Sequence, residues 1–218
     1  MHTAINFLKK LKKNNNKAWF EANRNVYTEA KQELENFLEG LISVYGKTDD
    51  SIASLTPKEC MFRINRDVRF SKDKSPYKLN FGASINSGGK KSSLAGYYLH
   101  IEPGKSFVGG GLWMPEPAEL SKIRQEIDYN LKEFTSLLKS PSFKKQFGTL
   151  YTGEDISLVR VPKGYEADNP AATYLKLKSF IATRSLTDEE ITSASLQKIC
   201  TSAFTALKPL LEFINRAK

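Results

Sequence analysis

The residues best suited to binding chemistry lie in one stretch, residues 58–78, which reads KECMFRINRDVRFSKDKSPYK. Three arginines recur there at intervals of three, as Arg63, Arg66 and Arg69. A guanidinium presents a planar fork of N–H donors that matches a carboxylate or a phosphate, and a lysine ammonium does not. Seven cations stand against three acids, so the stretch carries an excess of four positive charges. These features predict an anion site.

The local pattern also indicates how this site is built. Alternation over residues 61–64 is typical of a strand, and residues 65–67 are typical of a turn. The cations would then lie at a strand end and in its loop, where binding groups tend to gather. The predicted ligand-binding residues are Arg63, Arg66, Asp67, Arg69, Lys74, Tyr77 and Lys78. Arg160, Lys163, Lys176 and Lys178 would complete the pocket if their strands neighbour the motif.

The same stretch has a purely structural interpretation. Arg66 or Arg69, paired with Asp67 and with backbone carbonyls, would pin a loop without any ligand. Both interpretations hold together if Asp67 orients one arginine while the others face a ligand. Because three forks face one nearby acid, we expect at least one arginine to point into a solvent-reachable pocket.

Other candidate chemistry is weaker. Tyr98, His100 and Glu102 share one face of a predicted strand and form the best acid–base arrangement in the chain, although such a face is more typical of the solvated side of an antiparallel sheet. Residues 88–93, GGKKSS, lack the first glycine of a phosphate-binding loop, and residues 109–111 lack the third glycine of a dinucleotide fingerprint. We interpret the former as a hairpin turn and the latter as permitting close backbone packing or ligand approach. Two distant cysteines and two histidines predict no metal site, and nothing predicts a cofactor.

The composition and charge of the chain indicate which classes of partner to consider. The 218 residues carry a formal charge of +9, so phosphorylated metabolites, nucleic acid and a membrane surface are the partner classes to consider. We find neither a signal-peptide pattern nor an apolar run near the roughly 18 residues of a membrane span, so we expect a cytoplasmic protein without a membrane partner. No linker or repeat divides the chain, which predicts one domain over residues 1–218. The oligomeric state is not predicted.

The elements that must position the site follow from periodicity. Helical spacing predicts a helix at the N-terminus, a long helix from Asn16 to Gly46, a helix over residues 116–139 and a final helix that begins with the capping box at residues 187–190 and is kinked at Pro209. Alternation predicts strands near residues 80, 98, 107, 158 and 177, with Tyr174, Lys176 and Lys178 on one strand face. The expected fold class is α+β, with an antiparallel sheet flanked by long N-terminal, central and C-terminal helices.

The run Arg63-x-x-Arg66-Asp67-x-Arg69-Phe70, continued by Asp73-Lys74, Pro76-Tyr77 and Lys78, resembles the signature of a bacterial family of uncharacterised proteins known only as a domain of unknown function. The likeness continues through IEPGKSFVGGGLW and RVPKGY to YLKLKSF, so it covers most of the chain. The resemblance implies no reaction, cofactor or substrate. Where the family pattern often has Asp-His-Pro, this chain has Asp168, Asn169 and Pro170, which removes a possible general base.

Three functions are compatible with these sequence features. The first is binding, with turnover left open, of a small phosphorylated or carboxylated ligand at the arginine motif. The second is a nucleic-acid-binding module that uses the basic surface, although aromatics do not interleave with the cations as a stacking platform requires. The third is an arginine motif that serves structure alone. Whether the protein is an enzyme is left undecided at this stage.

Overall fold

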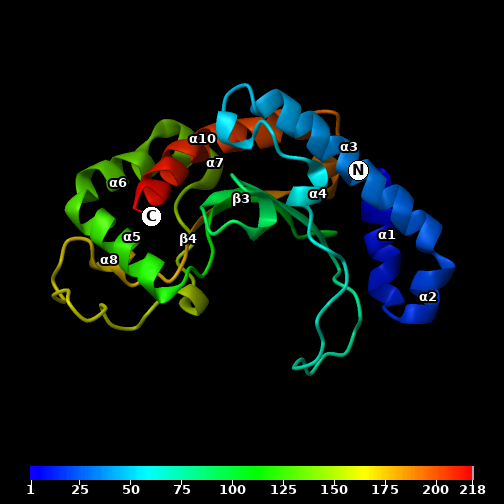
Figure 1. Cartoon of the computed structure of the whole chain (residues 1–218), viewed down its shortest axis with the longest axis horizontal. Helices are drawn as coiled ribbons and strands as arrows, with labels where there is room; N and C mark the ends of the chain where they lie inside the picture. Colours follow the sequence, from blue (N-terminus) through cyan, green and yellow to red (C-terminus); the bar gives the residue numbers. More distant parts are fainter. Residues whose placement is uncertain (218) are drawn as a thin grey trace. The chain divides into compact units, whose positions relative to one another are not determined.

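A computed structural model describes residues 1–217 and shows an α+β chain (Figure 1). Its sheet is antiparallel and has the strand order β1-β2-β3-β4. The strands are β1 (Phe81–Ile85), β2 (Gly96–Ile101), β3 (Ser106–Leu112) and β4 (Phe180–Leu186). The α-helices are α1 (His2–Lys13), α2 (Lys17–Ala22), α3 (Arg24–Tyr45), α4 (Pro57–Cys60), α5 (Pro117–Tyr129), α6 (Leu131–Lys139), α7 (Pro141–Phe147), α8 (Ala172–Leu175), α9 (Asp188–Thr192) and α10 (Leu196–Arg216). The predicted fold class is confirmed.

The chain divides into two compact units, which we describe separately. Unit 1 comprises residues 1–92, 98–108 and 185–201. Unit 2 comprises residues 93–97, residues 109–184 and the chain from Ser202 onward. The boundaries fall inside β2, β3, β4 and α10, so the prediction that residues 1–218 fold as one domain stays a prediction.

The helices of unit 1 pack around an aromatic cluster. Helix α1 carries its apolar residues on one face and packs on α3. The ring of Phe7 lies 6.0 Å from Phe20, 5.6 Å from Tyr27 and 6.3 Å from Phe81 of β1, measured between ring centres. Helices α1 and α3 are thereby fixed to the edge strand from which the candidate site extends.

The long helix predicted from Asn16 is two helices. Asn16 does cap α2, because its side-chain oxygen accepts a hydrogen bond of 2.9 Å from the N–H of Trp19. The helix then breaks at Asn23, whose side-chain amide donates to the carbonyl oxygen of Trp19. An asparagine that bonds to the backbone in this way competes with the helical ladder. Helix α3 continues to Tyr45, and Gly46 follows its end as predicted.

The sheet of unit 1 has one buried and one partly exposed face. Leu99 and Ile101 of β2 are buried, whereas Tyr98, His100 and Glu102 are partly exposed. The predicted sharing of one face by these three polar residues is therefore confirmed. Gly82 of β1 points to the same face of the sheet as Tyr98 of β2. The two residues are close neighbours, because a Cβ atom on Gly82 would lie 2.5 Å from the Tyr98 hydroxyl.

In unit 2, glycines allow β3 and β4 to approach closely. A Cβ on Gly109 would lie 2.1 Å from the carbonyl oxygen of Ala182, and one on Gly111 would lie 2.0 Å from that of Phe180. Gly111 also has a φ of 125°, which a residue with a side chain rarely adopts. The close-packing interpretation of these glycines fits the structure.

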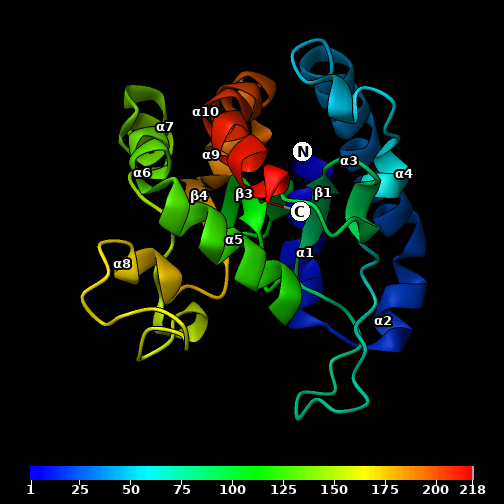
Figure 2. The ribbon, with the colours of Figure 1, turned by 60° about the vertical axis from the view of Figure 1, so that its left-hand side comes forward.

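Two of the predicted strands are wrong or misplaced. Residues 156–162 form no strand, and there Ser157 makes only an isolated bridge to Leu177 (Figure 2, yellow). Residues 172–175 form the short helix α8, and β4 begins only at Phe180. Tyr174, Lys176 and Lys178 therefore do not share a strand face. Asn169 explains part of this, because its side-chain oxygen accepts the N–H of Ala171 at 2.6 Å and starts a turn.

Two predicted helices are also interrupted. The helix predicted over residues 116–139 breaks at Asn130, whose side chain donates to Glu126 at 2.9 Å. The capping box of Thr187 and Glu190 is present, but it begins the short helix α9, and α10 follows after a break at residues 193–195. Pro209 lies inside α10 as expected.

Candidate functional site

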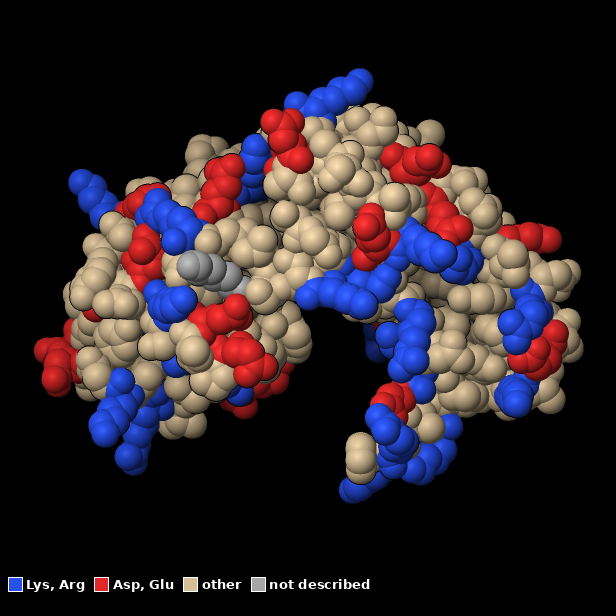
Figure 3. Space-filling model, in the orientation of Figure 1, with Lys and Arg blue, Asp and Glu red and all other residues tan. Residues whose placement is uncertain are grey.

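The arginine motif forms a long irregular hairpin between α4 and β1, which we call the cationic hairpin (residues 61–80). It projects from the rest of unit 1 in both ribbon views, and Lys and Arg side chains gather along it in Figure 3. In the predicted strand over residues 61–64, Met61 forms an isolated bridge to Ala83, and Asn65, which was predicted to lie in the turn, forms one to Tyr77. The predicted turn is a wider loop, residues 66–76.

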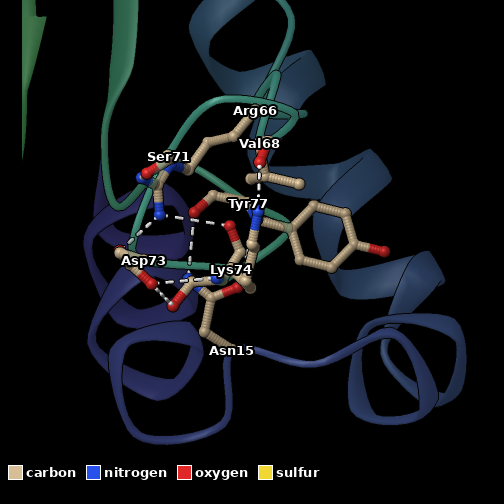
Figure 4. Close-up of polar contacts among 8 residues, drawn as sticks. Asn15, Arg66, Val68, Ser71, Asp73, Lys74 and Tyr77 are labelled. Atoms are coloured by element: carbon tan, nitrogen blue, oxygen red, sulfur yellow. Dashed lines mark hydrogen bonds and ion pairs between the residues drawn. The ribbon is translucent and has the colours of Figure 1, made fainter.

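Tyr77 anchors this hairpin to the core. Its side chain is 5% exposed, and its ring stacks on Phe20 with 3.9 Å between ring centres. The amide of Asn15 donates to the Tyr77 carbonyl at 2.9 Å and accepts the Tyr77 N–H at 3.2 Å (Figure 4). Tyr77, predicted as a ligand-binding residue, is placed where its ring stabilises the hairpin.

Arg66 ties the two arms of the loop together. Its guanidinium bonds to Asp73 at 2.5 Å, to the Ser75 carbonyl at 3.1 Å and to the Ser71 hydroxyl at 3.3 Å (Figure 4). The pKa of Asp73 falls to about 2, chiefly because the Ser75 hydroxyl and N–H donate to it, with Arg66 adding to the effect. The sequence indicated Asp67 as the one acid near the three arginines, but Asp73 is a second acid that pairs with one of them.

Arg69 is paired with Asp67, which fulfils the expectation that Asp67 orients one arginine. The guanidinium donates two bonds to the carboxylate, of 3.0 Å from Nε and 2.7 Å from Nη2. These bonds lower the pKa of Asp67. Lys74 donates to the carbonyls of Val68 at 3.0 Å and of Arg69 at 3.5 Å. Four of the predicted binding residues therefore bond to one another or to the backbone of the loop itself.

Arg63 and Lys78 differ from Arg66, Arg69 and Lys74 of the hairpin, which are all bonded within it. Within residues 1–217 neither side chain forms a hydrogen bond or an ion pair with an acid. Arg63 is exposed, and Lys78 is partly buried with its ammonium 5.6 Å from the ring centre of Phe62. The pKa of Lys78 is lowered, first by burial and then by repulsion from Arg63. Arg63 also contributes to the lowered pKa of Asp67. The base of the hairpin thus holds two cations close to each other.

An aromatic and polar surface of the sheet continues from Phe62. Phe62 lies 6.4 Å from Tyr98, Tyr98 lies 5.7 Å from Phe107, and Phe107 stacks on His100 at 4.7 Å, measured between ring centres. His100 Nε2 lies 3.0 Å from a carboxylate oxygen of Glu102. The side-chain amide of Asn80 lies 3.5 Å from His100 Nδ1. The sequence pattern showed the face of β2 but gave no signal that Phe62 and Phe107 extend it.

The other cations considered for the pocket lie in unit 2. Arg160, Lys163, Lys176 and Lys178 come from segments that do not form the strands expected of them. Asn169 donates to Asp128 at 2.7 Å. Within residues 1–217, no group of three or more His, Cys, Asp or Glu side chains is placed to hold a metal ion. None of the described helices has the length and apolar character needed to cross a membrane.

The protein is therefore an α+β protein with a cationic hairpin whose loop is held by ion pairs between its own residues. Residues 3–213 match the family described as conserved hypothetical protein (DUF2461), so the chain belongs to that family, in agreement with the resemblance stated above. A search of curated proteins and a search of solved structures each found no match.

Proposed function

We propose that this protein binds a small ligand bearing a phosphate or a carboxylate at Arg63 and Lys78. One observation carries the proposal: two cations lie close enough for Arg63 to lower the pKa of Lys78, and neither is paired with an acid among residues 1–217. Placing a partly buried ammonium beside a guanidinium is unfavourable unless an anion offsets it. Charge arrangements of this kind are found more often at functional sites than elsewhere.

The remaining arginines support the site by fixing the loop. The guanidinium of Arg66 bonds to Asp73, and the guanidinium of Arg69 bonds to Asp67. Both pairs hold the loop in shape without a ligand. Tyr77 and Asn15 fix the returning arm on which Lys78 follows directly. A cation pair held by a rigid frame loses less conformational entropy when a ligand binds. The structural and the binding interpretations of the motif thus apply to different arginines.

The test compares variants that each remove one positive charge. Inorganic phosphate, glycerol 3-phosphate and succinate are titrated into the wild type, R63Q, K78Q and the control K72Q, and binding is measured by calorimetry and by thermal shift. Lys72 is exposed on the same loop and has no ion pair among the described residues, which makes it a matched control. A ligand that binds only the native state raises the melting temperature with concentration.

We expect R63Q and K78Q to weaken anion binding by roughly 10-fold or more, since a hydrogen bond to a charged group is worth about 1.5–3 kcal/mol. K72Q should bind as the wild type does. R63K, which keeps the charge but not the fork, should fall between the wild type and R63Q. Equal binding by all variants, or no binding of any anion by the wild type, would contradict the proposal and favour a motif that serves structure alone.

Nucleic-acid binding is a second candidate, favoured by one feature of the loop. The side chain of Phe70 is 96% exposed, and the guanidinium of Arg69 lies 5.9 Å from its ring centre. An exposed ring beside cations is the arrangement on which an unpaired base stacks. If the basic hairpin contacts a single strand, affinity should fall with salt at a slope of about 0.7 for each phosphate neutralised. We expect only weak binding that is lost near physiological salt, and tight binding at that salt would favour this second function.

A further inference from the structure

We infer that the ligand bound at Arg63 and Lys78 is a nucleotide, whose base stacks on the ring surface formed by Phe62, Tyr98 and Phe107. This inference rests on the proposed function, since it assigns the phosphate to the same two cations. It adds the chemical class of the ligand, and it is carried by the surface that adjoins the cation pair within unit 1.

The rings form a continuous series that starts at the cations. The ammonium of Lys78 lies 5.6 Å from the ring centre of Phe62, and Phe62 lies 6.4 Å from Tyr98. Tyr98 lies 5.7 Å from Phe107 at an interplanar angle of 37°. A ligand that places its anionic group on Lys78 therefore has aromatic surface directly beside it. Stacking on such rings accepts any base, because every base has a π face.

These rings lie on the partly exposed face of the sheet. Phe62 is 38% exposed, and Tyr98 and Phe107 are partly exposed, whereas Leu99 and Val108, their neighbours along the strands, are buried. Three partly exposed rings in contact make an apolar surface that the fold itself does not cover. Apolar surface bordered by polar groups is typical of a ligand site.

The Tyr98 hydroxyl is a polar group without a partner on this surface. It makes no hydrogen bond among residues 1–217. It occupies the space over Gly82, where a Cβ atom would lie 2.5 Å from it, so the absence of a side chain at position 82 makes room for it. Burial raises the pKa of Tyr98, which keeps the hydroxyl protonated as a donor. A donor held in this position fits an acceptor on a base or a ribose.

Hydrogen-bonding groups also lie beside the rings. Asn80 offers a side-chain amide, and Glu102 offers a carboxylate already bonded to His100. The surface thus combines cations, aromatic rings and polar side chains. A nucleotide presents a phosphate, a sugar and a flat base with polar edges. The presence of cations, rings and hydrogen-bonding groups on one surface is what favours a nucleotide over a phosphate that lacks a ring.

The experiment separates the phosphate from the base. The wild type is titrated by calorimetry with AMP, GMP, CMP and UMP, with ribose 5-phosphate and with adenosine. We expect at least one nucleotide to bind roughly 5-fold or more tightly than ribose 5-phosphate, because stacking of a base contributes about 1–3 kcal/mol. The variant F62L should lower the affinity for the nucleotide by a larger factor than the affinity for ribose 5-phosphate, and should thereby reduce this preference.

F70L is the matched control, since it makes the same change in an exposed phenylalanine of the same hairpin that has no part in the ring series. It should keep the nucleotide preference. Y98F removes only a hydroxyl and should weaken nucleotide binding several-fold without lowering the melting temperature. Because F62L and Y98F change partly exposed groups, both variants are expected to fold.

The outcomes distinguish the two proposals. If ribose 5-phosphate binds as tightly as every nucleotide, the assignment of a nucleotide is wrong while the anion site stands. If adenosine binds as well as AMP and R63Q changes neither, the anion site is wrong. If no nucleotide binds, the assignment of a nucleotide is wrong, and both proposals fail if ribose 5-phosphate, inorganic phosphate, glycerol 3-phosphate and succinate do not bind either. Tight binding of a single-stranded oligonucleotide that AMP does not displace would also overturn the assignment in favour of nucleic acid.

Discussion

At the scale of single residues, Asp73 links the predicted motif to a measurable titration. Its pKa is lowered from the ordinary 3.8 to about 2 by the Ser75 hydroxyl first, then by the Ser75 N–H and by Arg66. A depressed pKa means that these bonds stabilise the loop fully above pH 3.8 and that the stabilisation is lost as the pH falls through about 2. We expect carbon-detected NMR of the Asp73 carboxyl group to show a midpoint near 2.

The variant S75A provides the control for this titration. It removes the Ser75 hydroxyl, which is the largest cause of the shift, and should therefore move the midpoint of Asp73 upward. Asp67 serves as an internal comparison, because its own pKa is lowered by Arg69 and should not respond to S75A. A wild-type midpoint at 3.8 would show that the bonds of Asp73 to Ser75 and Arg66 do not form in solution, and no change in S75A would show that the Ser75 hydroxyl does not bond to Asp73.

The residue types predicted where the candidate site lies in the chain but not which arginine pairs with which acid. Three arginines so close in sequence predicted a cationic cluster, and the structure gathers them on one hairpin. Which arginine is left without an acid depends on the path of residues 66–76, which places Asp73 against Arg66. An Asp-x-Ser spacing, with the acid accepting from the residue two positions on, was the available signal for that path.

At the scale of elements, the hairpin depends on one asparagine in the connection between α1 and α2. Asn15 makes two hydrogen bonds to the backbone of Tyr77, in the manner of a paired strand. The variant N15A leaves these partly buried backbone groups unsatisfied and should lower the free energy of unfolding by about 1–3 kcal/mol. In a chain of this size each kcal/mol lowers Tm by roughly 2–4 °C, which thermal melting followed by circular dichroism resolves.

N14A is the comparison for this prediction. Asn14 lies in the same connection, but its side chain donates only to the exposed carbonyl of Lys10. Its loss should change the stability by about 0.5 kcal/mol or less, as for most surface positions. If N15A and N14A melt at the same temperature as the wild type, the hairpin is not held to the helices by Asn15.

The predictions of single elements were right where the apolar periodicity extended over many residues and wrong where it covered only a few. Helix α1 and the alternation in β2 were recognised because several apolar residues repeat with one period. Residues 156–162 alternate over a few positions only, and such a run does not distinguish a strand from an irregular segment. The breaks at Asn23 and Asn130 depend on side-chain bonds to the preceding turn, which a pattern of apolar residues does not record.

At the scale of the whole molecule, the fold class followed from the order of helical and alternating segments, while the division into two units did not. No linker or change of composition marks a boundary, because the boundaries fall inside β2, β3, β4 and α10. Composition locates a domain boundary only where the chain is exposed and flexible between two cores. Continuous elements that contribute residues to both units leave no such signature.

The same continuity predicts how the chain unfolds. An element that loses its packing in one unit loses the helical or sheet hydrogen bonds that continue into the other, so we expect a single cooperative transition, as one domain over residues 1–218 requires. Urea unfolding followed by pulsed hydrogen–deuterium exchange and mass spectrometry reports α3 of unit 1 and α6 of unit 2 in the same sample. Both helices should lose protection at one urea concentration and with one denaturant slope. N15A, which weakens a contact of unit 1 alone, should shift the midpoints of both helices equally. Two separate midpoints, or a shift of α3 without α6, would mean that the units are independent domains, and the prediction of a single domain would then be wrong.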